Sequence, residues 1–143
     1  MSDDDEGSIL PLTIFFGVLS LALVLLVVAA SSLYLERKRL FTVADGAALV
    51  GAESFDLDGV AVASDGSFEV KLDDAEVKSA VEDYLDESPM NDFDRLTIVE
   101  ARSVDGRSAT VTLRAKWRAP VVSILVPDGL PVEVTAVARS VFD

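Results

Sequence analysis

The sequence predicts an α+β protein in which a long N-terminal membrane helix continues into a small head domain with an antiparallel sheet and one short helix. Three observations predict this fold. The run Ile9–Leu35 is apolar and uncharged, and a stripe of small residues at spacings of three and four continues the helical pattern to about Glu53. Beyond it, apolar and polar residues alternate with the period of two that is typical of half-buried strands.

The apolar run is long enough to cross a bilayer. It has 27 residues, whereas about 20 apolar residues span the hydrocarbon core. A cleaved signal peptide has a basic start and a shorter apolar region, but residues 1–8 form an acidic tail, and Ala29-Ala30-Ser31 resembles a cleavage site only weakly. We therefore expect residues 9–35 to be a retained transmembrane helix.

Residues 36–53 are expected to extend this helix beyond the membrane. One face carries mostly small residues, which let another backbone approach closely. The members of this packing stripe are Leu40, Val43, Ala44, Ala47, Ala48, Gly51 and Ala52. The stripe packs either on the sheet of its own chain or on a neighbouring subunit. On the second interpretation, leucine at Ala44, Ala48 and Ala52 would disrupt assembly without unfolding the head.

Residues 54–143 are expected to form the head domain. Asp65-Gly66 between alternating segments indicates a tight hairpin, and Asp105-Gly106-Arg107-Ser108 indicates a second hairpin. Asp73 or Asp74 can cap a helix that Ser88-Pro89 ends. The predicted strands are Val60–Ala63, Ser67–Leu72, Leu96–Val104, Ala109–Arg118 and Pro131–Phe142, with an apolar run at Val121–Val126.

The strand Ala109–Arg118 has two distinct faces. Trp117 lies on the apolar face, where it belongs to the core or anchors a partner. Arg114, Lys116 and Arg118 lie on the opposite face, which is either solvated or a candidate docking face for an acidic neighbour.

Composition excludes several chemistries. The chain has no cysteine and no histidine, so thiol or imidazole catalysis and zinc–thiolate sites are excluded. A net charge of −13 makes nucleic acid an improbable partner. The paired carboxylates Asp56/Asp58, Asp73/Asp74 and Glu82/Asp83 lie in polar segments, where no burial would raise a carboxyl pKa for acid–base work. Asp56-Leu57-Asp58-Gly59 resembles the start of a calcium loop, but Ser67 stands where glutamate is required. We predict no catalytic residue, metal, cofactor or small-molecule substrate.

Orientation in the membrane stays open from charge alone. Arg37, Lys38 and Arg39 mark the membrane boundary, and no lysine or arginine precedes the span. The positive-inside rule would place the head in the cytoplasm. The alternative is that these side chains only extend to lipid headgroups.

Residues 6–52 carry a family resemblance. Glu6-Gly7-Ser8 precedes the span, Tyr34–Leu40 closes it, and Ala44–Ala52 follows with the sequence ADGAALVGA. Together they resemble the N-terminal region of TadE/TadG-like proteins of tight-adherence (Flp) pilus assembly, including their ADAAALAGA stretch. The resemblance covers about a third of the chain.

The resemblance implies a non-enzymatic, minor-pilin-like subunit of a pilus or related secretion apparatus. It places the protein in a bacterial cell membrane as a single-pass protein, with the N-terminus in the cytoplasm and a pilin-like head outside. Its implied partners are membrane lipid and other pilus or assembly subunits, including further copies of itself. The alternative function is a monomeric membrane-tethered extracytoplasmic binding module that uses its acidic surface or its basic strand face.

Gly7 and Ser8 are a candidate processing site. Prepilin peptidase cuts after a glycine and favours glutamate five residues on, but this position is Leu12. The departure favours a chain that stays uncut and anchored.

Overall fold

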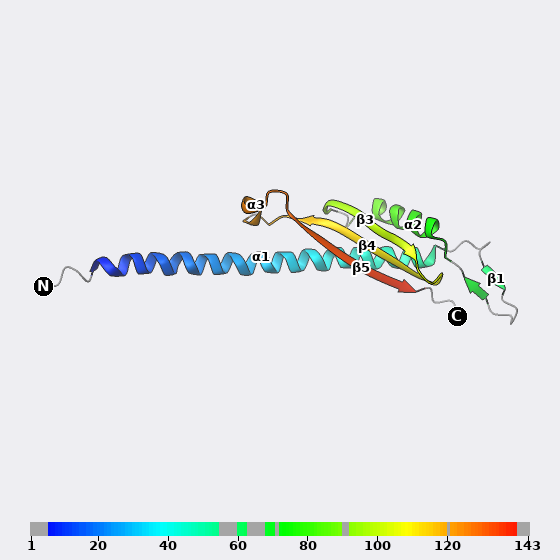
Figure 1. Ribbon diagram of the computed structural model, residues 1–143, viewed down its shortest axis with the longest axis horizontal. Coiled ribbons are helices and arrows are strands. Elements are labelled where there is room, and N and C mark those ends of the chain that lie inside the picture. The colour runs from blue at the N-terminus through cyan, green and yellow to red at the C-terminus, as the bar shows by residue number, and fades with distance from the viewer. Residues whose placement is uncertain are drawn as a thin grey trace.

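One helix dominates the fold. The computed structural model describes residues 6–54, 60–62, 68–70, 72–89, 92–119 and 121–139. Helix α1 spans Glu6–Glu53, and its 48 residues are about 72 Å long at 1.5 Å per residue. Its N-terminal half projects alone, while its C-terminal half lies along the sheet (Figure 1). The predicted α+β class and the uninterrupted helix are confirmed.

The head is built on a three-stranded antiparallel sheet. The strands are β3 (Asp94–Ser103), β4 (Ser108–Trp117) and β5 (Leu130–Arg139), in the order β3-β4-β5. The β4–β5 register is unbroken, whereas the β3–β4 register shifts twice. One shift adjoins Arg95, whose φ of 52° is in the left-handed region. Such bulges bend an edge strand and increase its twist.

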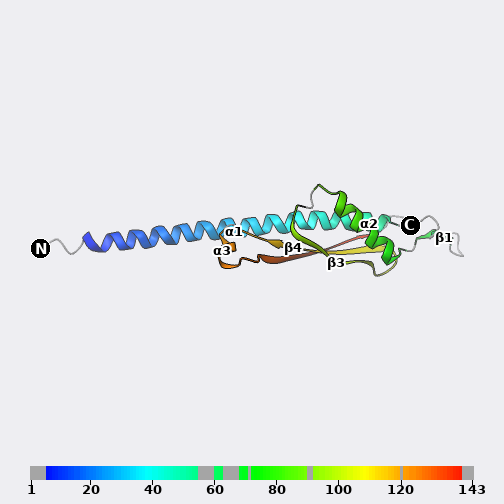
Figure 2. The ribbon, with the colours of Figure 1, turned by 90° about the horizontal axis from the view of Figure 1, so that it is seen from above.

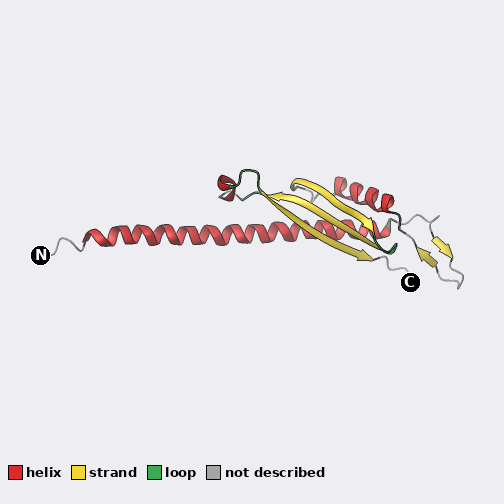
Figure 3. Ribbon diagram, viewed as in Figure 1, coloured by secondary structure: helices red, strands yellow, loops and turns green. Residues whose placement is uncertain are grey.

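Two helices cover one face of this sheet. α1 contacts β4 and β5, and α2 (Asp74–Glu87) contacts α1 and β3. Figure 2 shows the sheet almost edge-on along one side of α1, and Figure 3 shows the helices against the strands. Asp73 caps α2, since its carboxylate accepts the Ala75 N–H at 2.7 Å. Val77, Val81 and Leu85 form the buried face of α2, as the helical spacing predicts.

A single hydrophobic core joins the long helix to the head. The members that are entirely shielded from solvent come from α1, α2 and β4. They are Leu40, Val43, Ala44, Ala47, Ala48, Ala52, Val77, Val81, Ala109, Val111 and Leu113. The core therefore crosses the boundary between residues 53 and 54 at which the predicted head domain begins.

The remaining elements differ in detail from the predicted ones. Residues in the apolar run at Val121–Val126 form the short helix α3 (Val122–Leu125). β1 (Val60–Val62) and β2 (Phe68–Val70) pair in antiparallel fashion. The predicted turn at Asp65-Gly66 and the predicted strand end at Phe142 lie outside the described residues.

Candidate functional site

The N-terminal half of α1 is an exposed apolar rod. From Ile9 to Val28 every residue is exposed except Leu25, which is half-buried. The helix from Ile9 onward is long and apolar enough to cross a membrane, and its most apolar stretch is not buried by the rest of the protein. This length, composition and exposure are those of a single membrane-spanning segment.

The head contacts α1 before the predicted span ends. Ala29 and Leu33 pack against the core, and Trp117 donates its indole N–H to the Ser32 hydroxyl at 3.2 Å. Trp117 is only 5% exposed. It therefore belongs to the core and is not an exposed anchor for a partner, which were the two alternatives from the sequence. Residues 29–35 were predicted to be membrane helix, but one side of this segment is covered by the head.

The basic cluster at the predicted membrane boundary is exposed. Arg39 lies 3.7 Å from the Glu36 carboxylate and 5.6 Å from the centre of the Phe93 ring, within reach of a cation–π contact. Arg37 lines a shallow hollow together with Glu133 of β5. All three side chains, Arg37, Lys38 and Arg39, are exposed to solvent.

The packing stripe faces the sheet of its own chain. Leu40, Val43, Ala44, Ala47, Ala48 and Ala52 have no exposed surface, and Gly51 is buried. A Cβ at Gly51 would lie 3.2 Å from both Ala109 Cβ and Val77 Cγ1. Leucine side chains at Ala44, Ala48 and Ala52 would enter a filled core, so the burial of these alanines favours a loss of head stability in the triple variant.

The candidate docking face is largely neutralised by acidic neighbours. Arg114 Nη2 lies 2.6 Å from Glu133 Oε2, and Arg118 Nε lies 2.7 Å from Asp94 Oδ2. Lys116 is half-buried between them. This face therefore presents compensated charge, which weakens the case for capture of an acidic ligand.

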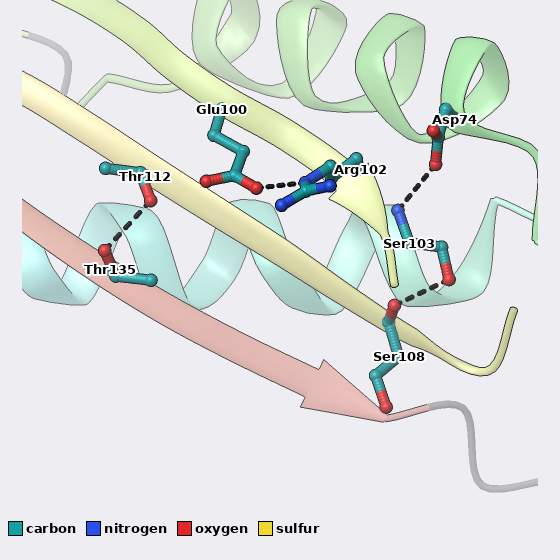
Figure 4. Close-up of polar contacts among 7 residues, drawn as sticks. All are labelled: Asp74, Glu100, Arg102, Ser103, Ser108, Thr112 and Thr135. Atoms are coloured by element: carbon teal, nitrogen blue, oxygen red, sulfur yellow. Dashed lines mark hydrogen bonds and ion pairs between the residues drawn. The ribbon is translucent and has the colours of Figure 1, made fainter. Parts of the chain in front are cut away.

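Polar contacts on the sheet are structural. Figure 4 shows Thr112 and Thr135 joined by their hydroxyls at 2.9 Å, and an ion pair between Arg102 and Glu100. The side-chain hydrogen bond and charge of Glu100 raise the pKa of Arg102 above its usual value. Asp74 accepts the Ser103 N–H at 2.8 Å and so ties α2 to the end of β3.

The β3–β4 turn is fixed by one carboxylate. Asp105 Oδ1 accepts the N–H groups of Arg107 at 3.0 Å and Ser108 at 2.6 Å, and Gly106 adopts a φ of 72°. The hydrogen bond from the Arg107 N–H, followed by those from Ser108, lowers the pKa of Asp105. The predicted hairpin signal Asp105-Gly106 thus has a direct structural basis.

The carboxylate pairs take capping and surface roles. Asp73 caps α2, Asp74 binds Ser103, and Glu82 pairs with Lys78 at 3.9 Å. Asp56 and Asp58 lie outside the described residues. Within the described ranges, no group of three carboxylates could hold a metal ion.

The candidate processing site lies at the start of α1. Gly7 and Ser8 are both helical and fall in its first turn, close to Glu6. Leu12 lies one turn further along and is exposed.

Sequence reasoning missed three features. Phe41 and Leu49 lie two turns apart on the outward side of α1 and are 48% and 50% exposed. Gly46 faces Tyr84 of α2, and an added Cβ would overlap the Tyr84 hydroxyl. The third feature is α3, which has no buried residue. The helical spacing of Phe41 and Leu49 could have indicated a second apolar face on α1. The contact between Gly46 and Tyr84 and the exposure of α3 depend on tertiary structure.

The comparison with protein families matches the long helix α1. Neither the curated proteins nor the solved structures contain a match to this chain. The matched segment is residues 7–54, which is α1 without Glu6 and with one following residue. Over these residues the chain matches the family described as putative Flp pilus-assembly TadE/G-like, which confirms the resemblance carried by residues 6–52.

Proposed function

We propose that this protein is a non-enzymatic, membrane-anchored structural or assembly component of a Flp-type pilus or a related secretion apparatus. The observation that carries the proposal is the coincidence of the TadE/G-like match, residues 7–54, with the whole of α1. The matched segment is therefore one physical element, exposed and apolar in its first half and part of the core in its second. The apolar half of this helix would hold the head at the membrane.

The proposed orientation places the N-terminus in the cytoplasm and the head outside a bacterial cell membrane. The family resemblance supports it, whereas Arg37, Lys38 and Arg39 favour the opposite orientation by charge count. An extracellular head would be labelled in intact cells by a membrane-impermeant maleimide at Val104→Cys.

Subunit contacts along α1 would use its outward face. The packing stripe is buried in the head, so a neighbouring subunit cannot reach it without unfolding the chain. Phe41 and Leu49 remain exposed on the segment beyond the membrane, beside the exposed Thr42 and Asp45. Exposed apolar residues two helical turns apart are suited to packing against a second helix.

The test is complementation of a strain that lacks the gene. The wild-type chain should restore surface pili, counted by electron microscopy, while Phe41→Ser with Leu49→Ser should reduce them at unchanged protein abundance. Val137→Ser is the matched control, because Val137 is 61% exposed on β5 and outside α1. It should restore pili fully.

The outcomes separate the parts of the proposal. Normal pili in the deletion strain would contradict a role in pilus assembly. Loss of pili on deletion, with full rescue by the double variant, would contradict only the contact face on α1.

A further inference from the structure

The loop between β4 and β5 exposes the most solvent-accessible large apolar side chains of the described chain. α3 places Ile124 at 78% and Leu125 at 84% exposure, above every residue of the exposed apolar rod. Val121 and Leu130 flank them and are 42% and 39% exposed. Adjacent apolar side chains exposed to this degree indicate a surface that is covered in the working protein.

The loop lies at the end of the head that faces the membrane span. Its two ends meet at the paired residues Trp117 and Leu130, and Trp117 binds Ser32 of α1. From there the chain continues toward the N-terminal half of α1, and α3 lies beside the middle of α1 in both views (Figures 1 and 2). Leu25 and Ala29 are the first half-buried residues of α1.

Along the axis of α1, α3 lies at the position where the edge of the bilayer is expected. Ile9–Val28 has 20 residues and is about 30 Å long, the thickness of the hydrocarbon core. The interfacial layer adds roughly 5–7 Å on each side, which corresponds to about four helical residues beyond Val28. Ser32, at the base of the loop, falls at the outer limit of this layer, and α3 lies on its membrane side.

We propose that α3 is a second membrane anchor that inserts Ile124 and Leu125 into the lipid interface beside α1. The occupant of this apolar surface is the bilayer itself, because α3 lies beside the membrane-spanning helix at the level where that helix leaves the hydrocarbon core. Two anchors fix the tilt and rotation of the head relative to the membrane, which one helix cannot do. The proposal depends on α1 crossing the membrane and does not depend on the pilus role.

Insertion would be driven by apolar burial and not by charge. Asp128 is exposed on the same loop, and the chain carries a net charge of −13. Neutral phosphatidylcholine should therefore suffice, since anionic lipid would repel the loop.

The experiment uses the full chain in phosphatidylcholine nanodiscs that hold one copy each. The chain has no cysteine, so a single Leu125→Cys can carry a small fluorophore. Lipids with a spin label near the headgroup should quench this fluorophore. Val18→Cys within the span should be quenched by lipids labelled deep in the acyl chain. Val104→Cys is the matched control, being 69% exposed on the β3–β4 turn beside Asp105, and it should escape both quenchers.

A second variant tests whether the loop itself or the attached fluorophore drives insertion into the lipid. Ile124→Ser, added to the Leu125→Cys chain, should lower the partition of the loop into lipid roughly tenfold, because one large apolar side chain is removed. Val137→Ser in the same chain should leave the quenching unchanged. If Ile124→Ser has no effect, the label alone drives insertion and the proposal is overturned.

The quenching results at positions 18 and 125 also test the proposal. Quenching at position 18 without quenching at 125 overturns the second anchor alone. A fluorophore at 125 that is shielded from water but not quenched by lipid is covered by protein, which also overturns it. Absence of quenching at position 18 would overturn the membrane span together with the second anchor.

Discussion

At the residue scale, the small side chains of α1 allow the helix to pack closely on the sheet. Ala48 is fully buried where α1 packs on the sheet. Ala48→Leu should lower the free energy of unfolding by about 1–3 kcal/mol, the usual effect of overpacking a filled core. Thermal unfolding of the full chain in detergent, followed by the fluorescence of the single tryptophan, measures this loss. Thr42→Leu, on the exposed side of α1, should have little effect, and equal losses for both variants would contradict the packing role.

The carboxylate of Asp105 should make the β3–β4 turn sensitive to acid. Backbone N–H groups lower its pKa in the folded chain, whereas the pKa returns to about 3.9 on unfolding. Its stabilising effect is complete above the unfolded pKa and is lost as the pH falls through the lower folded pKa.

Asp105→Ala should therefore lower the melting temperature at neutral pH by more than it does in acid below the folded pKa. Paired melting curves of the two chains across this range check the sign. Asp128→Ala, which changes another turn carboxylate, is the control. A loss at Asp105 that does not depend on pH would show that the turn needs the side chain but not its charge.

At the element scale, Gly46 leaves room on α1 for the Tyr84 ring of α2. Glycine inside a helix costs about 1 kcal/mol relative to alanine, so alanine would ordinarily be favoured here. A Cβ at this position would overlap the Tyr84 hydroxyl and lie 2.9 Å from Cζ of the same ring. Gly46→Ala should thus be destabilising in the wild-type chain.

The same change should become stabilising when Tyr84 is first replaced by alanine, because the space is then vacant. A double-mutant cycle from thermal unfolding measures this coupling. Additive effects of the two substitutions would contradict a direct contact between Gly46 and Tyr84.

At the scale of the whole molecule, the head and half of α1 form one folding unit. Core contacts on α1 begin at Ala29, and six fully buried core residues lie between Leu40 and Ala52. A chain that begins at residue 29 should therefore fold, with a cooperative melting curve and dispersed amide resonances. A chain that begins at residue 54 should not, because it lacks this side of its core. A folded 54–143 fragment would show that the sheet and α2 suffice.

The sequence alone determined the elements with strong local signals. An uncharged apolar run of 27 residues is long enough to predict a membrane helix, and the spacing from Leu40 to Ala52 predicts that the helix continues. Alternation and turn chemistry placed β3 and β4 to within two residues, because Asp105-Gly106 sets the hairpin locally. The TadE/G-like resemblance was likewise readable, since it lies within the single segment 7–54.

Tertiary structure decided what each face of those elements contacts. Periodicity shows that the packing stripe shares one face but cannot say whether its own sheet or a second chain lies against it; the burial of Ala44 and Ala48 answers that. The partners Glu133 and Asp94 of the basic strand face come from other strands. The level of α3 beside the span depends on how β4 lies along α1, which is fixed by long-range packing. Such contacts join residues far apart in the chain, so no local pattern encodes them.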